Sequence, residues 1–394
     1  MKRPSLLVIF LSVFIDLIGF GIVMPLLPLY SKEFGSPGYL IGLIMASFSV
    51  MQFLFAPLWG RLSDRIGRRP VLIISNAGSA IAYALFAIAS QRGGQTGLFM
   101  ILVSRIFAGL CGANLSVASA YIADITPPEK RSKGMALIGV AFGLGFILGP
   151  AFGSFSYAQW GIAGPGWAAA SICAANVIFG FLVLVESRQP SSESAAKRPR
   201  LGQWAHTLTQ PTVGLLVILY FQAIFCFAAF ETTFGLLIEP LGYSEKNVGY
   251  FIAYCGFVTV LIQGAIGRLV KMFGERKLIP LSLFTAGAGL AMLPFVTSKP
   301  GILLGLAVLA IGSGVNRAPT MGLISILTTP AEQGATMGVT QSAGSLARIL
   351  APVFAGAFFD YSHAAPYLIC ALLAVLFGVI AWLNLCRAPA PRGP

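Results

Sequence analysis

Residues 6–30 read LLVIFLSVFIDLIGFGIVMPLLPLY, an apolar run interrupted by one charged side chain, Asp16. A helix needs about 20 residues to cross a bilayer, so this run is long enough to span one. A carboxylate inside such a helix costs about 2.5–3.5 kcal/mol to insert, and it usually faces a protein or water-filled interior. Pro25 and Pro28 break the far end, which suits a helix that moves against its neighbours. The run predicts a membrane-spanning helix with an inward-facing acid.

Composition extends this prediction to the whole chain. Hydrophobic residues make up 57% and charged residues 10% of the sequence, with a mean hydropathy of +0.84, whereas soluble domains carry about 25% charged residues. Irregular backbone cannot face lipid, so the apolar runs are expected to be α-helices. They lie near residues 6–30, 38–60, 70–90, 97–121, 133–157, 166–185, 212–238, 247–267, 278–297, 302–327, 334–358 and 364–386. We expect an all-α membrane protein with twelve transmembrane helices.

The net charge of +13 follows the predicted loops. With the amino terminus placed inside, the opposite loops hold only four basic residues, Lys32, Arg92, Lys246 and Lys299, and nineteen others lie on cytoplasmic segments. This positive-inside bias predicts that both termini are cytoplasmic. The short loops favour a bacterial inner membrane over other plasma membranes. Topology accounts for the basic charge, so we expect no nucleic-acid partner.

The sequence contains no residue pattern typical of a metal site, a cofactor site or a disulfide framework. All six cysteines fall inside predicted spans without CxxC spacing, which is typical of small buried side chains. The two histidines, His206 and His363, lie in loops or at helix edges and are too few for a metal centre. We therefore expect no metal, no cofactor and no enzymatic activity.

The chain divides into two similar halves. A Ser-, Pro- and Arg-rich linker at 187–211 separates a six-helix half at 1–186 from a six-helix half at 212–394. Gly60-Arg-Leu recurs as Gly267-Arg-Leu, and Thr126-Pro recurs as Thr329-Pro. Parallel six-helix repeats are a known transporter plan, in which substrate binds between the halves near the midplane.

The segment Gly60-Arg-Leu-Ser-Asp64-Arg-Ile-Gly-Arg68-Arg-Pro, predicted as the loop after the second span, matches the Gly-x-x-x-Asp-Arg-x-Gly-Arg-Arg signature of the major facilitator superfamily. Ser104-Arg105-Ile-Phe-Ala-Gly in the fourth span and Gly145-Phe-Ile-Leu-Gly149-Pro-Ala-Phe-Gly in the fifth span resemble two further signatures of that family. The chain is similar above all to tetracycline-efflux pumps and related drug:proton antiporters. The resemblance implies alternating access and a monomer.

The resemblance gives two of these motifs a role. It implies that Asp64, Arg68 and Asp124, with Gly60 on the same turn, latch the cytoplasmic side against the start of helix 11 and favour an outward-open state. A simpler reading of the arginines is positive-inside anchoring, but that rule does not require Asp64. Lys271 stands at the place of Asp64 in the second half, so only the first half can hold the full latch.

The glycine motif of the fifth span comprises Gly145, Gly149, Pro150 and Gly153. Glycines one turn apart permit close helix packing, and the proline bends the helix. Tight packing alone would explain the pattern. The resemblance associates it with antiporters, in which it seals the interface against leak.

Four further charges lie within predicted spans, namely Arg105, Glu231, Arg317 and Arg348. They either pair with one another across the bundle or, with Asp16, line a polar cavity that binds substrate and protons. We expect Asp16 or Glu231 to carry the proton, with Asp16 as the first choice.

These observations predict a secondary transporter in the lipid bilayer that exports a small amphipathic organic compound in exchange for protons. The alternative is a uniporter or symporter of organic anions, favoured by the three intramembrane arginines. A membrane-embedded enzyme or receptor would need a nucleophile with a base, a metal cluster or a ligand domain, and the sequence offers none.

Overall fold

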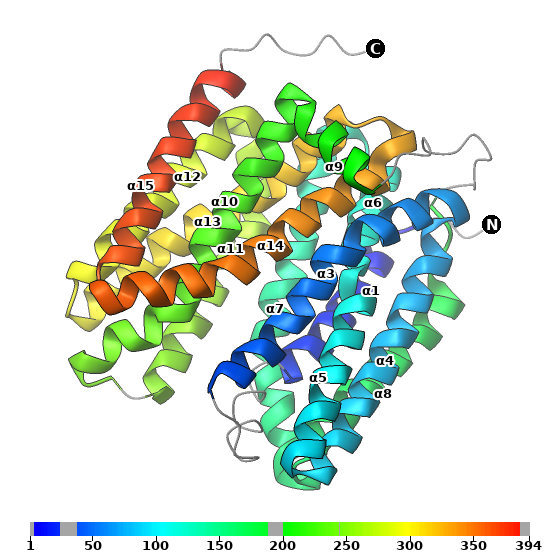
Figure 1. Ribbon diagram of the computed structural model, residues 1–394. Helices are drawn as coiled ribbons and strands as arrows, with labels where there is room; N and C mark the ends of the chain where they lie inside the picture. Colours follow the sequence, from blue (N-terminus) through cyan, green and yellow to red (C-terminus); the bar gives the residue numbers. More distant parts are fainter. Residues whose placement is uncertain (1–3, 24–37, 188–199, 244, 387–394) are drawn as a thin grey trace. The chain divides into compact units, whose positions relative to one another are not determined.

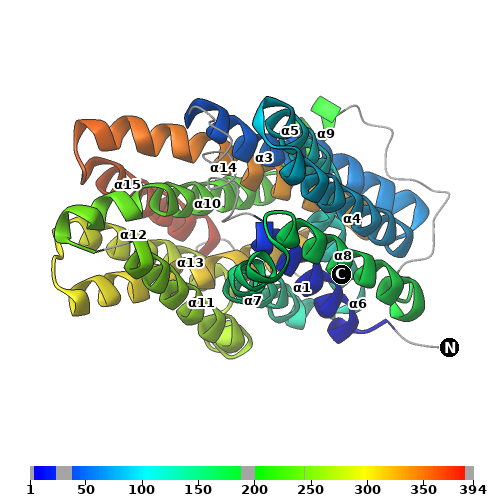
Figure 2. The same ribbon diagram turned by 90° about the horizontal axis from the view of Figure 1, so that it is seen from below.

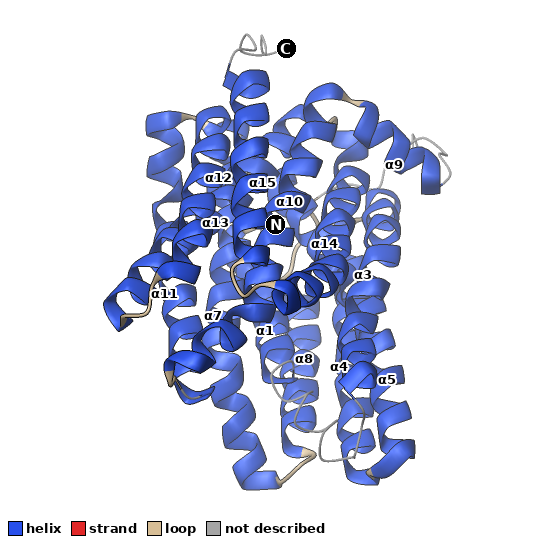
Figure 3. Ribbon diagram, turned by 60° about the vertical axis from the view of Figure 1, so that its left-hand side comes forward, coloured by secondary structure: helices blue, strands red, loops and turns tan. Residues whose placement is uncertain are grey.

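The computed structural model describes residues 4–23, 38–187, 200–243 and 245–386. Helices dominate these residues, and no strand occurs among them (Figure 3). Their bounds are α1 (Leu6–Val23), α3 (Gly38–Ile66), α4 (Arg68–Arg92), α5 (Gly94–Cys111), α6 (Leu115–Ile125), α7 (Arg131–Trp160), α8 (Gly164–Val183), α9 (Arg200–Thr209), α10 (Pro211–Ile238), α11 (Glu245–Phe273), α12 (Glu275–Met292), α13 (Lys299–Leu327), α14 (Gln333–Tyr361) and α15 (Ala365–Ala381).

The spans expected from the sequence are present. Eleven of the described helical segments are long and apolar enough to cross a membrane, and one of them joins α5 and α6 through the 3₁₀ turn Gly112–Asn114. The remaining expected span coincides with α3, a helix of 29 residues. The all-α fold with twelve spans is thereby confirmed. Residues 24–30 of the first expected span and 188–199 of the expected linker lie outside the described residues.

The chain forms two compact units. Unit 1 comprises Met1–Pro127, Val140–Gln203 and Thr328–Ile349, and unit 2 comprises Pro128–Gly139, Trp204–Leu327 and Leu350–Pro394. Each unit therefore contains most of one sequence half together with the beginning of a helix from the other half. The start of α14 belongs to unit 1, and the start of α7 belongs to unit 2.

Unit 1 is a bundle in which α4 packs against both α5 and α8 (Figure 1). α1 packs on α8, and α3 packs on α5. Fully buried Ile22, Phe86 and Ile101 lie in its apolar core. Lipid tails are as apolar as these side chains, so close packing and internal hydrogen bonds must hold the helices together. The polar residues buried in this bundle are therefore candidates for these internal hydrogen bonds.

Unit 2 has a corresponding arrangement, in which α12 packs against α13 and α15 and α11 packs against α13 (Figure 2). α10 lies against α13 and α15. Its core is rich in aromatic residues, including the neighbouring rings of Phe230 and Phe234, whose centroids are 5.1 Å apart. A Cβ on Gly312 would overlap the backbone of Ala286, so α13 and α12 approach closely there.

Candidate functional site

The turn between α3 and α4 is tighter than the sequence suggested. The segment Gly60–Pro70 was expected to be a loop, which is wrong: α3 continues to Ile66 and α4 begins at Arg68. Gly67 alone makes the turn, with φ +98°, a conformation that L side chains rarely adopt. Its N–H donates to the Ser63 carbonyl at 3.2 Å. Charged residues end a hydropathy run but do not end a helix, so the motif lies on two helix ends.

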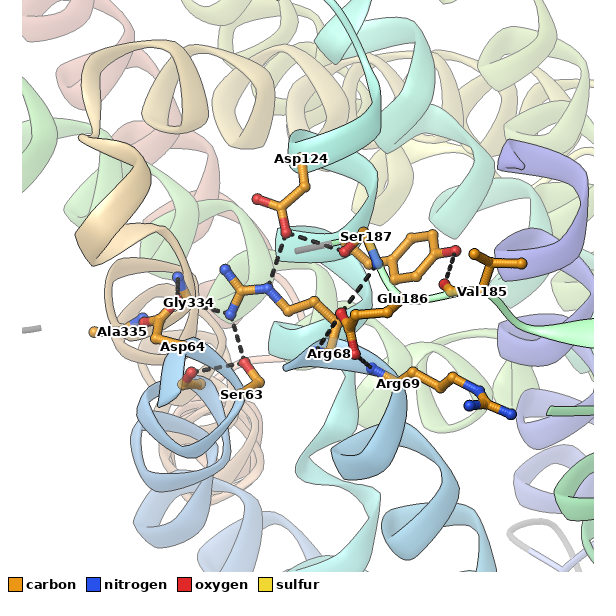
Figure 4. Close-up of polar contacts among 12 residues, drawn as sticks. Ser63, Asp64, Arg68, Arg69, Asp124, Val185, Glu186, Ser187, Gly334 and Ala335 are labelled. Carbon is orange, nitrogen blue, oxygen red and sulfur yellow. Dashed lines mark hydrogen bonds and ion pairs between the residues drawn. The ribbon is translucent and has the colours of Figure 1, made fainter. Parts of the chain in front are cut away.

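Asp64 caps the amino terminus of α14. Its Oδ1 accepts from the backbone N–H of Gly334 at 3.1 Å, and its Oδ2 accepts from Ala335 N–H at 3.0 Å (Figure 4). The first N–H groups of a helix have no partner within the helix, and their end carries partial positive charge. A buried carboxylate that accepts two of them joins the end of α3 to the start of α14.

Arg68 connects this cap to Asp124. Its Nη1 lies 2.7 Å from Asp64 Oδ1, and its Nε lies 3.0 Å from Asp124 Oδ2. Nη1 also donates to Ser63 Oγ at 2.6 Å. The Arg68 side chain is fully buried, and a buried charge is tolerated when it is paired and hydrogen-bonded. The structure thus brings together Asp64, Arg68 and Asp124, the three charged residues predicted for the latch.

Two glycines allow the same contact. A Cβ on Gly60 would overlap the Gly334 carbonyl, and a Cβ on Gly334 would overlap the Gly60 backbone and the Asp64 carboxylate. The cap consequently depends on a close approach between α3 and α14 at these positions. Further along, Ser342 donates to the Phe53 carbonyl, so the contact extends over several turns of both helices.

Sequence reasoning missed Glu186, which caps α4. Its Oε1 accepts from Arg68 N–H at 2.9 Å, and its Oε2 accepts from Arg69 N–H at 3.0 Å (Figure 4). The next residue, Ser187, donates from Oγ to Asp124 Oδ2 at 3.1 Å. Asp64 and Glu186 therefore cap the starts of α14 and α4, and Arg68 joins the two caps through its side chain and its backbone N–H. The available signal was a lone acid directly after the sixth apolar run.

The corresponding turn of unit 2 uses different residues. Lys271 occupies the place of Asp64, as predicted, and Glu275 follows Gly274, where the first half has Arg68. Glu275 Oε1 accepts from Ser132 Oγ in the first turn of α7 at 3.0 Å. A carboxylate thus meets a helix start in this unit too, but it comes from the helix after the turn.

Asp16 lies in a polar cluster inside unit 1. Asn114 Nδ2 lies 3.4 Å from Asp16 Oδ2 and 3.1 Å from Asn76 Oδ1, and Asn76 Nδ2 lies 3.4 Å from Ser12 Oγ. The 3₁₀ turn between α5 and α6 ends at Asn114 and places that amide beside α1. The predicted acid is therefore surrounded by neutral polar groups from three spans. Sequence reasoning did not identify the two asparagines, because they are far apart in the chain.

Arg105 is buried between aromatic rings. Its guanidinium carbon lies 5.4 Å from the ring centroids of both Tyr83 and Phe86, a cation–π arrangement. The side chain is 1% exposed, and its Nε and Nη2 have no hydrogen-bond partner among the described residues. An intramembrane cation of this kind is costly and calls for an anionic or π partner.

The glycine motif packs against α1. Cβ atoms on Gly145 and Gly149 would overlap the backbone of Leu17 and Gly21, respectively. Gly153 is buried on the same helix, and Pro150 lies within α7. The close helix packing expected from the motif is present.

The remaining predicted residues lie on three helices. Glu231 is an exposed residue of α10, Arg317 is a half-buried residue of α13, and Arg348 is a half-buried residue of α14. Glu231 and Arg317 belong to unit 2, whereas Arg348 belongs to unit 1. Their roles stay predictions. In the described part of the chain, no group of three His, Cys, Asp or Glu side chains is placed to hold a metal ion.

Two bundles of helices that are long and apolar enough to cross a membrane define a multi-pass membrane protein. The model of the Major Facilitator Superfamily matches residues 9–352 and 256–394. The chain belongs to this family.

Curated relatives agree with this assignment. The chain is 33% identical over 351 residues to the class E tetracycline resistance protein of Escherichia coli, covering 86% of this chain and 84% of the relative. It is 30% identical to the class D protein of Salmonella ordonez, covering 99% of each.

Solved structures show the same fold. The human organic anion transporter MFSD10 superposes with a TM-score of 0.83 at 27% identity, covering 96% of this chain and 100% of that one. The proton:xylose symporter XylE superposes with a TM-score of 0.76 at 17% identity over 96% of each chain, a likeness of fold alone.

Proposed function

We propose that this protein is a secondary active transporter that exports a small amphipathic organic compound in exchange for protons. The observation that carries the proposal is Asp16, a carboxylate within a membrane-spanning helix, with Asn114 at 3.4 Å from its Oδ2. A proton carrier must be protonated in one phase of the cycle and charged or substrate-bound in another. The amides beside Asp16 can hydrogen-bond to its carboxyl group in the protonated or the charged form, since an amide both donates and accepts hydrogen bonds.

Two structural features support alternating access in an exporter. The Asp64 cap would hold α3 against α14 in one state and release them in the other, so the cap would bias the balance between states. The packing of Gly145 and Gly149 on α1 leaves little room between these helices, as a barrier to leak requires. The tetracycline resistance proteins among the relatives favour efflux of drug-like compounds.

The charge pattern and the family support a location and an assembly state. We place the protein in a plasma membrane, most simply a bacterial inner membrane, with both termini in the cytoplasm and as a monomer. The end of α3 and the capped starts of α4 and α14 would then face the cytoplasm. Its partners would be the organic substrate, protons and the surrounding lipid, with no nucleic acid and no cofactor.

Uptake into inverted membrane vesicles tests the function. Vesicles that contain the protein should accumulate the transported compound when their interior is made acidic, and an uncoupler should abolish the accumulation. Vesicles with Asp16→Asn are the matched control. Equal accumulation with and without the proton gradient would contradict proton exchange.

A second candidate function is the transport of organic anions. Arg105 favours it, because its buried guanidinium has two nitrogens without hydrogen-bond partners, and the MFSD10 structure is that of an organic anion transporter. Transport of an organic anion into proteoliposomes with no opposing proton movement would support this alternative and contradict proton-coupled export.

A further inference from the structure

The span that comprises α5 and α6 is interrupted by the 3₁₀ turn Gly112–Asn114. The last carbonyl groups of an α-helix lack a partner within that helix. Around this turn three consecutive carbonyls accept hydrogen bonds from side chains of α3 and α4: Leu110 from Trp59 Nε1 at 2.6 Å, Cys111 from Ser75 Oγ at 2.5 Å and Gly112 from Gln52 Nε2 at 3.0 Å. Side chains of the neighbouring helices therefore fix the place of the turn.

Of these donors, Gln52 contacts the turn itself. Its partner Gly112 begins the turn and Asn114 ends it, and Asn114 Nδ2 lies 3.4 Å from Asp16 Oδ2. A Cβ on Gly112 would lie 3.2 Å from the Phe48 ring, so the turn packs closely on α3. In a turn of 3 residues, the place of the first determines that of the last. Gln52 thereby positions the amide beside the acid.

The other side of the Gln52 amide faces α14. The Gly112 carbonyl can only accept, so the NH₂ group of Gln52 must face it and Oε1 is left for a donor. Ser345 Oγ lies 3.4 Å from this oxygen and 3.1 Å from the Gln341 carbonyl, so one hydroxyl hydrogen serves two acceptors. Gln52 and Ser345 are 7% and 2% exposed. One buried amide thus joins α14 to the turn beside Asp16.

The contact between α3 and α14 runs from the Asp64 cap through Ser342 to Gln52. On α3 the cap and Gln52 are 12 residues apart, which is about 18 Å along a helix. α14 belongs to unit 1 as far as Ile349 and to unit 2 beyond it. A movement of one unit against the other would therefore act on α14 and would draw Ser345 away from Gln52.

We propose that Gln52 is a positioning residue for Asp16. Its NH₂ group holds the turn so that Asn114 lies beside the carboxyl group, and Ser345 fixes the amide in that orientation only while α14 lies on α3. When α14 separates from α3, the Gln52 amide loses its second partner, the turn is held less firmly and Asn114 leaves Asp16. The inference rests on the proposed function, since it connects the proton-binding group with the helix contact that changes between states.

Infrared spectroscopy of the full-length protein in nanodiscs measures the contact at Asp16. At acidic pH the protonated carboxyl group gives a C=O stretching band, identified by its loss in Asp16→Asn, and a hydrogen bond to the carbonyl oxygen lowers its wavenumber. Asn114→Leu gives the position of the band without the amide. Gln52→Leu should lower the ratio of the bonded to the unbonded band about fivefold, the effect of one net hydrogen bond.

Ser345→Ala tests the dependence on α14. It removes one hydroxyl group and retains the fold, and it should change the band ratio in the same direction as Gln52→Leu. Both changes act through one contact, so the double variant should show no more change than Gln52→Leu alone.

Gln263→Leu is the matched control. Gln263 is a buried glutamine of unit 2 that donates to the Gly314 carbonyl at 2.9 Å. This variant loses the same kind of contact as Gln52→Leu, in a different unit from Asp16, and should leave the Asp16 band unchanged.

A wild-type band in Gln52→Leu would overturn the positioning role, and so would an equal shift in Gln263→Leu. A wild-type band in Ser345→Ala would overturn the dependence on α14. If wild-type vesicles show no proton-driven uptake although the expected band shifts occur, the proposed function fails and the positioning role stands. Proton-driven uptake together with an unchanged band in Gln52→Leu gives the reverse result.

Discussion

Replacing Asp64 with Asn should weaken the contact between α3 and α14 by about a hundredfold. The amide keeps the shape and one acceptor oxygen, but it removes the charge that lies 2.7 Å from Arg68 in a pair with side chains 0% and 1% exposed. Removing one partner of a buried pair costs about 3–5 kcal/mol. Asp124 remains 3.0 Å from the guanidinium, so we take the lower end, about 3 kcal/mol, which is about a hundredfold in population.

Hydrogen exchange at the start of α14 measures this change. The Gly334 and Ala335 amides donate to Asp64, so their protection depends on the cap. A peptide covering these amides should exchange about a hundredfold faster in Asp64→Asn than in the wild type. Asp360→Asn, at the exposed far end of the same helix, is the matched control and should exchange as the wild type does.

Transport should fall with the same variant, while folding and membrane level stay largely intact. Asp64 acts through the balance of states, so its loss should slow the cycle and leave substrate affinity within each state unchanged. Unchanged exchange at Gly334 and Ala335 would refute the cap. Faster exchange with wild-type transport would leave the cap as a structural element only.

Three further predictions concern the packing and the topology. Glu186→Gln should weaken the cap of α4 by up to about 2 kcal/mol, measured as faster amide exchange in its first turn; exchange equal to the wild type would contradict that cap. Gly149→Ala should lower the free energy of unfolding by about 1–3 kcal/mol, because the added Cβ would overlap α1. Gly256→Ala, with open space around it, should leave the free energy of unfolding unchanged. Equal effects of the two variants would contradict close packing at Gly149. Single cysteines at Ser192 and Gln91, probed with an impermeant thiol reagent on intact cells, should react at Gln91 alone, and the opposite pattern would reverse the orientation.

The sequence predicts the features that depend on hydropathy and on local spacing. The length of each apolar run predicts the spans. Asp64 and Arg68 are four residues apart in one motif, and the family resemblance supplies their partners, Asp124 and the start of α14. The helical continuation to Ile66 could not be predicted, because hydropathy ends a span at Arg61, whereas the helix ends at Gly67, where the backbone adopts a positive φ.

Contacts between distant segments are also beyond the sequence. Glu186 is separated from Arg68 by more than a hundred residues, and Asn114 is separated from Asp16 by nearly as many. The register of packed helices decides which polar groups meet, and a single sequence does not define that register.

Proton-driven accumulation by wild type, Asp16→Asn and Glu231→Gln tests the central claim most directly. In proteoliposomes with an imposed pH gradient, the wild type should concentrate the transported compound against its gradient. Asp16→Asn should lose this uphill transport while it retains downhill exchange, because the amide keeps the shape but cannot titrate. Uphill accumulation by both amide variants, equal to that of the wild type, would contradict the account.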